Sequence, residues 1–464
     1  MGKYKRLISN AAIFGAGTFI SKVLVFLLMP FYTALLSTEQ FGVADVLSQT
    51  ANLIIPLAVL GISDGLFRFA LEGSKADRAR VFNSAFFVFL CGLIPIAALV
   101  QILRIFSIYD GYVWLIFFYV FSANLHSICA NYIRACDKTK TFALQGIINT
   151  ALTIVFNILF LAVFKMGVLG YVLSVAVSDL TVTLGLIIFC KIYKDIRFKI
   201  PDKALLGSML KFSIPYIPTT MMWMITSASD RFILTAFSGA SENGLYAAAY
   251  KLPTLISLAG GVFVEAWHLS SVNDASDKER SGFFEGVYKN YIGIMFMGAS
   301  TIVVFSKILT MLLLNSSYYA SWKYVPVLSI AMIFSAFSAF MGSVYFIEKR
   351  STRSLITAAS GAISNIALNV LLIPKYGAMG AAIATVASYV LVYVIRACDT
   401  RRYLKFNLCV IKVVINSLVL IVQTVIMILE VPYWIYWQIA IVVFMILFNG
   451  RDIVKGMLRI LKKK

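Results

Sequence analysis

Residues 11–36, AAIFGAGTFISKVLVFLLMPFYTALL, form an apolar run whose single charge is Lys22. At about 1.5 Å of rise per residue, this run is longer than the roughly 20 residues that an α-helix needs to cross a bilayer core. Gly15, Gly17 and Pro30 lie on either side of the lysine and favour a bent helix. The stretch therefore predicts a membrane-spanning helix with a cation near its middle.

The composition of the whole chain is typical of an α-helical membrane protein. Of its 464 residues, 60% are hydrophobic and 13% are charged, a balance that water-soluble domains do not have. The net charge is +20, but the basic residues lie in short clusters between apolar segments, which indicates topology and not a nucleic-acid partner. The six cysteines show no C-x-x-C spacing and the chain has two histidines, so no metal centre is predicted.

Further apolar segments follow along the chain and predict an all-α fold that is integral to the membrane, with about fourteen transmembrane helices. The expected spans are roughly residues 8–36, 42–70, 81–103, 113–133, 141–164, 168–190, 212–237, 244–268, 289–313, 323–347, 354–374, 379–398, 408–429 and 433–449.

The distribution of basic residues predicts which side of the membrane each loop faces. An even number of spans places both termini on one side, and 31 of the 41 lysines and arginines lie at the termini or in the loops of that side. Five lie in the opposite loops. By the positive-inside rule, both termini are therefore predicted to be cytoplasmic, in a multi-pass protein of the cell membrane.

Two pairs of similar segments indicate an internal repeat. STEQFGVA (37–44) resembles ASENGLYA (240–247), and GVLGYVLSVAVSDL (167–180) resembles GAMGAAIATVASYV (377–390). Because each pair stands at equivalent places, we expect two six-helix lobes related as parallel repeats, followed by two C-terminal helices. The expected parts are an N-lobe (1–190), a basic cytoplasmic linker (191–211), a C-lobe (212–398), and spans thirteen and fourteen with a basic tail (399–464).

Basic residues inside the predicted spans are candidates for binding an anionic substrate, because a charge at membrane depth needs a partner or a wet cavity. Lys22 lies near the middle of the first span, Lys251 about two turns into the eighth, and Arg68 late in the second. Asp64 precedes Arg68 by four residues, so a structural ion pair is the alternative for Arg68. For the two lysines, the alternative is an ammonium group that reaches the membrane interface.

Acidic and titratable residues in the spans are candidates for ion coupling. Asp179 lies near the middle of the sixth span and His126 near the middle of the fourth, which suits a proton relay. A protonated carboxyl satisfied by neighbouring hydroxyls is the alternative for Asp179. Asp230 lies near the outer end of the seventh span, beyond two prolines that predict a kink. No phosphate-binding loop or Ser/His/Asp arrangement is evident, so the sequence predicts a transporter and not an enzyme.

Two motifs support a family resemblance. FG-x-x-D (41–45) opens the second span, and DRFILTAFSGASENGLYAAAYKL (230–252) joins the seventh and eighth. Over essentially its whole length, the chain resembles the Wzx-like flippases of polysaccharide synthesis. These belong to the multidrug/oligosaccharidyl-lipid/polysaccharide (MOP) exporter superfamily, which also holds lipid II flippases of the MurJ type and multidrug exporters of the MATE type.

The resemblance implies roles for particular basic residues. SKVLVF (21–26) is similar to the first-helix segment of MurJ-like flippases, where a basic residue faces the lipid diphosphate, and Lys22 stands at that place. Lys251 falls where the eighth helix of those flippases has an arginine. Leu28 and residues 55–56 stand where two further arginines would be expected, which favours a Wzx-like substrate over lipid II.

The resemblance also implies a site for a coupling ion. Asn365 and Asn369 in the eleventh span, with Thr385 in the twelfth, are similar to the sodium site of MurJ-like proteins, and Asp230 could add one charge. Neutral oxygens with one carboxylate suit a weak site for a hard cation. The second asparagine replaces a carboxylate of the family pattern, so a proton is the alternative coupling ion.

Together these observations predict a flippase that moves polyprenyl-diphosphate-linked oligosaccharide repeat units across the cytoplasmic membrane, by alternating access of two lobes around a cationic cavity. Lysines would attract the diphosphate as point charges. No cofactor is expected beyond sodium or a proton, and the expected partners are the lipid-linked glycan, the bilayer, and the polymerase and glycosyltransferases of the same pathway. Two alternatives stay open, a MATE-like exporter of small organic cations and a lipid II flippase.

Overall fold

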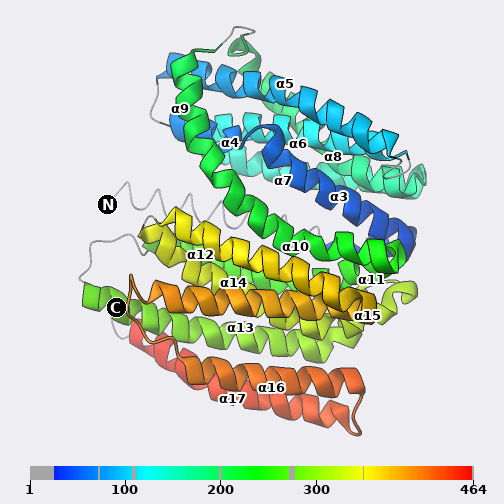
Figure 1. The fold of residues 1–464 in the computed structure, drawn as a ribbon, viewed down its shortest axis with the longest axis vertical. Helices are drawn as coiled ribbons and strands as arrows, with labels where there is room; N and C mark the ends of the chain where they lie inside the picture. The colour runs from blue at the N-terminus through cyan, green and yellow to red at the C-terminus, as the bar shows by residue number, and fades with distance from the viewer. Residues whose placement is uncertain are drawn as a thin grey trace. The chain divides into compact units, whose positions relative to one another are not determined.

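A computed structural model describes residues 26–71, 74–106, 111–197, 201–270, 277–348 and 350–461. These residues form α-helices joined by short loops and by 3-10 or π turns, and no strand occurs among them (Figure 1). The chain packs into two compact units, which we call unit 1 (residues 1–225) and unit 2 (residues 226–464). The boundary falls within the seventh predicted span, because the first part of that span packs on unit 1, where Ser213 and Ile217 lie next to Gly61 and Gly65.

Unit 1 contains helices that match the second to sixth predicted spans and begin the seventh. Two of them start with a capping box, at Ser37 with Gln40 and at Ser74 with Asp77, which satisfies backbone N–H groups that have no partner within the helix. The helices are α2 (Met29–Leu35), α3 (Thr38–Ala58), α4 (Ile62–Ala70), α5 (Lys75–Ile105), α6 (Val113–Ala135), α7 (Thr139–Asn157), α8 (Gly167–Phe189), α9 (Lys203–Ser213) and α10 (Ile217–Ser238).

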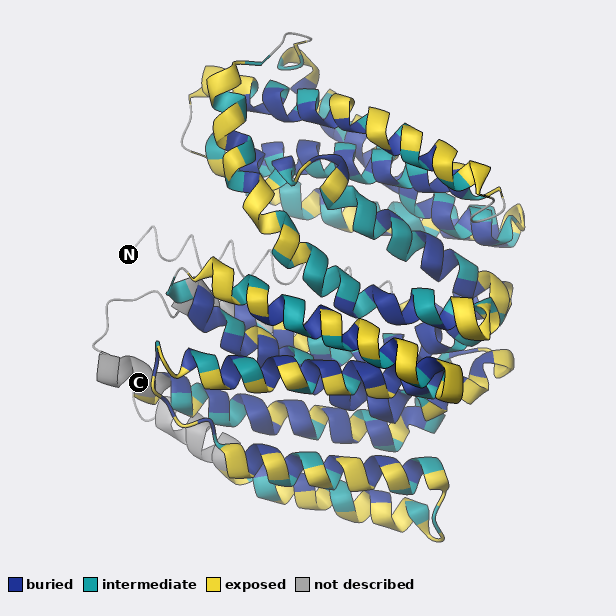
Figure 2. Cartoon of the chain, in the orientation of Figure 1, coloured by how far each residue is buried: buried dark blue, intermediate teal, exposed yellow. Residues whose placement is uncertain are grey.

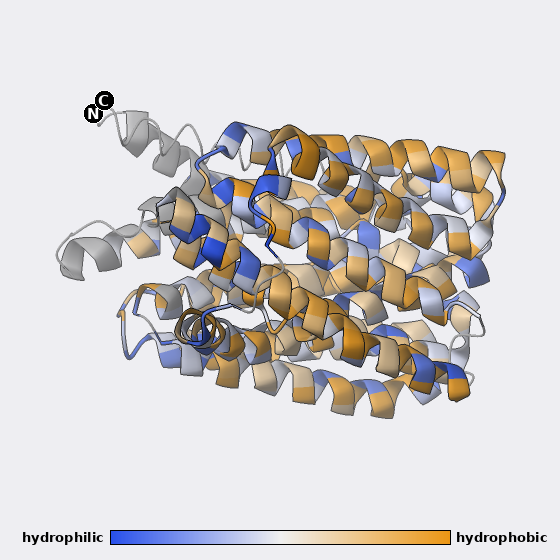
Figure 3. Ribbon diagram, turned by 90° about the horizontal axis from the view of Figure 1, so that it is seen from above, coloured by the Kyte–Doolittle hydropathy of each residue, from blue (hydrophilic) through white to orange (hydrophobic). Residues whose placement is uncertain are grey.

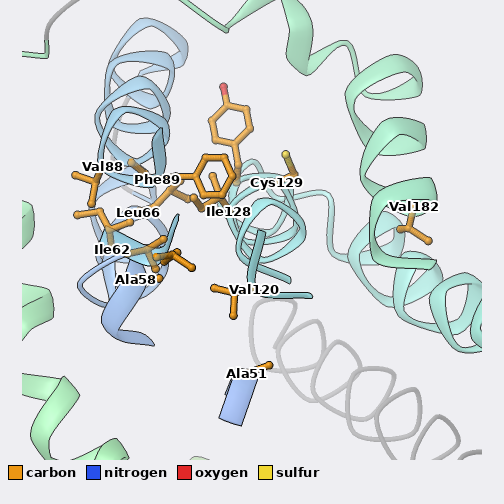
Figure 4. Packing of buried hydrophobic residues seen from close by; sticks show 14 of the residues in the cluster. Ala51, Ala58, Ile62, Leu66, Val88, Phe89, Val120, Ile128, Cys129 and Val182 are labelled. Carbon is orange, nitrogen blue, oxygen red and sulfur yellow. The ribbon is translucent and has the colours of Figure 1, made fainter. Parts of the chain in front are cut away.

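The core of unit 1 is an apolar cluster between α3, α4, α5, α6 and α8. Figure 4 shows Ile62 and Leu66 of α4 next to Val88 and Phe89 of α5 and Ile128 of α6. Ile62, Leu66 and Ile128 are completely buried. This packing fixes the positions of α6 and α8, which hold polar side chains described in the next subsection.

Two glycines allow α4 to approach α9 and the start of α10 closely. A Cβ on Gly65 would lie 3.3 Å from the Met209 carbonyl oxygen and would collide with Oγ of Ser213. A Cβ on Gly61 would lie 3.3 Å from Cγ1 of Ile217. The close helix contact that a G-x-x-x-G spacing favours is therefore present here. Helix α9, which begins inside the predicted linker 191–211 and ends at Ser213, packs against α4 of the N-lobe.

Unit 2 begins with the last part of α10 and matches the eighth to fourteenth predicted spans. Its final pair, α16 and α17, lies side by side and packs on α13 (Figure 1). The helices are α11 (Ala240–Lys251), α12 (Thr254–Ser270), α13 (Asp277–Leu313), α14 (Val325–Ile347), α15 (Ser351–Thr400), α16 (Val410–Leu429) and α17 (Trp434–Leu461).

Two spans that the sequence predicts as single helices are broken in the structure. The second is interrupted between α3 and α4, where Leu60 and Gly61 take left-handed φ angles of 49° and 62°. The eighth is interrupted between α11 and α12, because Pro253 has no N–H for the helical ladder. The Thr254 hydroxyl donates instead to the Lys251 carbonyl at 2.5 Å. Such interruptions at membrane depth are typical of transporter binding regions.

Matching glycine geometry in the two units agrees with the predicted repeat. Gly167 at the start of α8 and Gly377 within α15 have φ angles of 56° and 53°, and each lies close to the beginning of its unit's second span. The nearest side chains are Gln40 in unit 1 and Glu242 in unit 2. Gly377 also separates the eleventh from the twelfth predicted span, because its φ and ψ of 53° and −135° interrupt α15.

The surfaces of the helices fit a lipid environment. Ten helices of the described residues are long and apolar enough to cross a membrane, and one of them, α15, covers two predicted spans. Large apolar side chains are exposed along outer helices (Figure 2). Examples are Ile411 of α16, which is 77% exposed, and Leu447 of α17, which is 68% exposed. Figure 3 shows apolar residues along most of the length of the helices. The chain is therefore a multi-pass membrane protein.

Candidate functional site

A fully buried carboxylate lies at the centre of a polar cluster in unit 2. Asp230 of α10 is 0% exposed, and its Oδ2 accepts a 2.6 Å hydrogen bond from the hydroxyl of Tyr246 on α11. Its Oδ1 accepts from the backbone N–H of Arg231 at 2.9 Å. Burying a carboxylate away from water is costly, and these two donors offset part of that cost.

Arg231 supplies the positive charge of this cluster. Its guanidinium lies 3.1 Å from Oδ1 of Asp230 and also donates to the backbone carbonyl of Ser227. The guanidinium carbon lies 4.4 Å from the ring centroid of Tyr250, a cation–π distance. The two neighbours in sequence thus form a buried ion pair whose net charge is zero.

Two asparagines extend the cluster onto α15. Asn365 Oδ1 accepts from the Ser229 hydroxyl at 2.5 Å and from Asn369 Nδ2 at 2.9 Å. Both asparagines are 0% exposed, and Asn365 Nδ2 and Asn369 Oδ1 have no hydrogen-bond partner. Buried amide atoms without a partner are costly, so this pair is suited to a group that the protein alone does not supply.

Thr385 connects the same helix to the carboxylate. Its Oγ1 lies 3.4 Å from the Tyr246 hydroxyl, which in turn donates to Asp230. The structure therefore brings Asp230, Asn365, Asn369 and Thr385 into one buried region of unit 2, where α10, α11 and α15 meet. Asn369 Oδ1, Thr385 Oγ1 and the carboxylate are oxygen ligands of the kind that sodium prefers, although Arg231 already balances the carboxylate charge.

A second polar cluster lies in unit 1 and joins His126 to Asp179. Nδ1 of His126 on α6 lies 3.2 Å from Oδ1 of Asp179 on α8, and their side chains are 15% and 10% exposed. Nε2 of His126 lies 2.7 Å from Oε1 of Gln145, and Asn149 Nδ2 donates to the same Asp179 oxygen at 2.8 Å. Both glutamine and asparagine come from α7.

The contacts of His126 are compatible with two protonation states of its imidazole. As placed, both ring nitrogens of His126 face acceptor oxygens, which an imidazolium beside a carboxylate satisfies. If the Gln145 amide turns over, its NH₂ donates to Nε2 and a neutral imidazole is satisfied equally well. One amide rotation therefore accommodates either protonation state, as a proton-exchanging site requires.

The two units do not duplicate this chemistry. In the repeat of GVLGYVLSVAVSDL (167–180) and GAMGAAIATVASYV (377–390), Asp179 corresponds to Tyr389. Tyr389 is 4% exposed and provides no carboxylate. The buried carboxylate of unit 2, Asp230, lies in the seventh predicted span, whose equivalent in the repeat is the first span and not the sixth.

The predicted substrate-binding cations occupy different settings. Lys22 lies outside the described residues. Lys251 is the last residue of α11 and is half-buried beside the break in the eighth span. Arg68 is exposed on α4, after the break in the second span.

Several polar side chains of these two clusters were not predicted from the sequence. Tyr246, Ser229, Gln145 and Asn149 become evident only through their partners, although Gln145 and Asn149 stand one helical turn apart within an apolar span. Arg396, which the charge count assigns to a cytoplasmic loop, is 3% exposed within α15 and donates to Thr357 and to the Ser338 carbonyl. The helix continues to Thr400 and buries it.

The sequence of this chain is similar to those of known proteins. A family described as "Polysaccharide biosynthesis protein" matches residues 7–267, more than half of the chain. An uncharacterized membrane protein of Methanocaldococcus jannaschii is 21% identical over 395 residues, which are 79% of this chain and 91% of that protein.

Solved structures show the same fold at low sequence identity. Lipid II flippase MurJ in an inward closed conformation superposes with a TM-score of 0.72 at 15% identity, over 96% of this chain and 100% of that one. A multidrug resistance MATE family transporter of the MOP superfamily, in an inward-facing conformation, gives a TM-score of 0.66 at 13% identity, over 82% of this chain and 95% of that one.

Proposed function

The chain belongs to the polysaccharide biosynthesis protein family, and from this membership we propose that it is a flippase for polyprenyl-diphosphate-linked oligosaccharide repeat units. It moves them across the cytoplasmic membrane by alternating access, for the synthesis of a cell-surface polysaccharide. The family match is the observation on which the proposal rests, and the MurJ-like and MATE-like fold supports it. The reaction is transport, with no covalent change to the substrate.

Three cations are assigned to the substrate diphosphate: Lys22, Lys251 and Arg68. Lys251 and Arg68 each lie on a half-helix next to a break, and the breaks are at residues 59–61 and 252–253. Substrate sites in transporters are typically formed where membrane helices are discontinuous. Lysine acts there as a point charge, whereas arginine adds a planar fork for phosphate oxygens.

Ion coupling is assigned to the two buried clusters. In unit 2, Asn369 Oδ1, Thr385 Oγ1 and Asp230 would hold sodium, and the partnerless Asn369 oxygen supports this fit. Movement of sodium down its gradient would supply the free energy for translocation. In unit 1, His126 and Asp179 would hold a proton, and the turnable Gln145 amide supports that assignment.

The pathway chemistry implies partners on both sides of the membrane. Glycosyltransferases must build the lipid-linked glycan before it is moved, and a polymerase must consume it afterwards. Both would act on the same lipid-linked glycan within the bilayer. The orientation with cytoplasmic termini, proposed from the positive-inside rule, places the glycosyltransferases on the side of the basic loops.

The experiment is a translocation assay with the purified full chain in proteoliposomes. The substrate is a fluorescent polyprenyl-diphosphate oligosaccharide, and the signal is quenching from outside by dithionite. We expect faster loss of the protected half of the fluorescence than in protein-free vesicles. Lys251→Gln should slow it, whereas Lys375→Gln, an exposed lysine in the same unit, should not.

Parallel assays separate the two alternatives. Fluorescent lipid II in the same vesicles tests the lipid II flippase, and counterflow of a small organic cation tests the MATE-like exporter. Translocation of lipid II in preference to the oligosaccharide lipid, or transport of the cation alone, would replace the proposed substrate.

A further inference from the structure

The ends of α6 and α8 and the start of α5 enclose a cavity of about 570 Å³ in unit 1. We call it the basic pocket. Its charged lining consists of Arg78, Lys138, Lys191, Lys194 and one carboxylate, Asp195. Four cations facing one anion in a cavity of this size suit a small ligand group with negative charge.

The wall that contains Lys191 and Lys194 is held in place by specific bonds. Asp195 accepts a 2.9 Å hydrogen bond at Oδ2 from the hydroxyl of Tyr132 and a 2.6 Å bond at its backbone carbonyl from Asn83. Lys191 itself takes a left-handed φ of 61°, which ends α8 and turns the chain. The Asp195 carboxylate is therefore engaged with Tyr132, and among the described residues it forms no ion pair with the lysines.

The carboxylates of the protein leave the pocket with a net positive charge. Arg78 lies 3.8 Å from Asp137, whose side chain is 85% exposed, and its Nε donates to the Ala70 carbonyl. No described residue accepts a hydrogen bond from the ammonium groups of Lys138, Lys191 or Lys194. Three lysines thus remain available to an external anion.

An apolar surface continues directly from the pocket along α8. Leu184, Ile188 and Phe189 are 57%, 61% and 86% exposed, and Leu184 and Ile188 share one face of the helix. Phe189 immediately precedes Cys190 and Lys191, which line the pocket. A ligand with an anionic head and an apolar tail would satisfy both surfaces, whereas a soluble phosphate would use the pocket alone.

We propose that the basic pocket binds the phosphate-bearing headgroup of an anionic phospholipid, with its acyl chain along the exposed face of α8. The helix ends at the pocket place it at headgroup depth, and the positive-inside rule assigns that depth to the cytoplasmic leaflet. None of the residues assigned to substrate or coupling ion lines this pocket, so the site can be tested independently of transport.

The rate at which two native cysteines are alkylated measures whether the basic pocket is occupied. Cys136 and Cys190 line the pocket and are half-buried, while Cys398 is exposed in unit 2 and serves as an internal control. Burial raises the pKa of the Cys136 thiol, so its alkylation is slow and easily timed. The full chain in detergent is treated with a maleimide, and alkylation of each cysteine is quantified by peptide mass spectrometry with added phosphatidylglycerol or phosphatidylcholine.

At a lipid concentration ten times its Kd, phosphatidylglycerol should slow alkylation of Cys136 and Cys190 about tenfold. It should leave Cys398 unchanged, and phosphatidylcholine should have no effect. The triple variant Lys138→Gln, Lys191→Gln, Lys194→Gln should bind about fivefold more weakly per lysine, on the order of a hundredfold in total. Its arginine counterpart should retain binding, which excludes a folding defect.

The matched control is Lys140→Gln, Lys203→Gln, Lys211→Gln, which removes the same charge from exposed positions of unit 1 outside the pocket. It should keep full protection. Equal protection in the pocket variant and the wild type would overturn the proposal. Equal protection by glycerol phosphate would assign the pocket to soluble phosphates, and protection by polyprenyl diphosphate alone would assign it to substrate; either result would overturn it.

Discussion

The Tyr246 hydroxyl donates a 2.6 Å hydrogen bond to Oδ2 of Asp230 and so joins α11 to α10 in the interior of unit 2. Both residues are 0% exposed. The carboxylate is shared between this phenol and the guanidinium of Arg231, and the phenol also approaches Thr385. Changes at this bond should therefore affect stability and ion coupling together.

Asp230→Asn should destabilise the protein strongly, because it leaves Arg231 buried without its counter-charge. Removal of one partner of a buried pair costs about 3–5 kcal/mol. Thermal unfolding in detergent measures the loss, and Asp230→Asn with Arg231→Met should recover much of it. Tyr246→Phe removes only the hydrogen bond and should cost about 1.5–3 kcal/mol. Wild-type stability in Asp230→Asn would show that the pair does not support the fold.

Replacing sodium by potassium at constant membrane voltage should slow translocation, because the larger potassium ion fits a small set of oxygen ligands less well. Asn369→Leu should lower the rate in sodium and abolish the difference between the two ions. The measurement is the proteoliposome assay with matched salts. An unchanged rate in potassium would contradict sodium coupling and favour coupling to a proton at Asp179. In that case, Asp179→Asn should remove the response of translocation to a pH gradient.

Lys22→Arg should retain function, since arginine keeps the charge and adds a bidentate fork. Lys22→Met keeps the volume but loses a charge-assisted contact worth roughly 1.5–3 kcal/mol, so substrate binding should weaken on the order of ten- to a hundredfold. Lys22→Glu should be worse, because repulsion replaces attraction. Complementation of polymer export at matched expression decides this, and full activity of the Met and Glu variants would remove Lys22 from the site.

Gly65→Ala should destabilise unit 1, because the added methyl group meets Ser213 and the Met209 carbonyl. Overpacking of this kind costs about 1–3 kcal/mol. Ser213→Ala should relieve much of the loss, since the Ser213 hydroxyl is buried without a hydrogen-bond partner. The control is Gly146→Ala on α7, where no neighbouring atom lies within 4 Å of the new methyl group. Equal unfolding temperatures for Gly65→Ala and Gly146→Ala would contradict the close contact.

Cysteine labelling tests the membrane orientation. In a cysteine-free background, Ser241→Cys should react with an impermeant maleimide in intact cells, and Arg353→Cys only after permeabilisation. Both positions are exposed in the structure, so access depends on the side of the membrane. Because 31 of the 41 basic residues lie on the predicted cytoplasmic side, the reverse pattern would invalidate the orientation.

Membrane insertion and the repeat could be predicted from the sequence because both depend on local composition. A helix of about 20 apolar residues is favourable in lipid whatever its neighbours are, and every predicted span from the second onwards corresponds to helix in the structure. The repeat was also visible as sequence similarity, since Gly167 and Gly377 are needed for the same left-handed turn. The breaks at Leu60 and Leu252 were not predicted, because apolar residues continue through them.

The partners of each polar residue were decided only by the tertiary structure. The sequence shows that Asp179 and Asp230 must be satisfied inside the membrane, because an unpaired charge there is costly. It does not show that Asn149 and His126 satisfy the first or that Tyr246 satisfies the second. Helices pack in lipid through small residues and interhelical hydrogen bonds, with little hydrophobic driving force between them. The choice of partner therefore depends on side chains from several helices at once, and only their packing determines it.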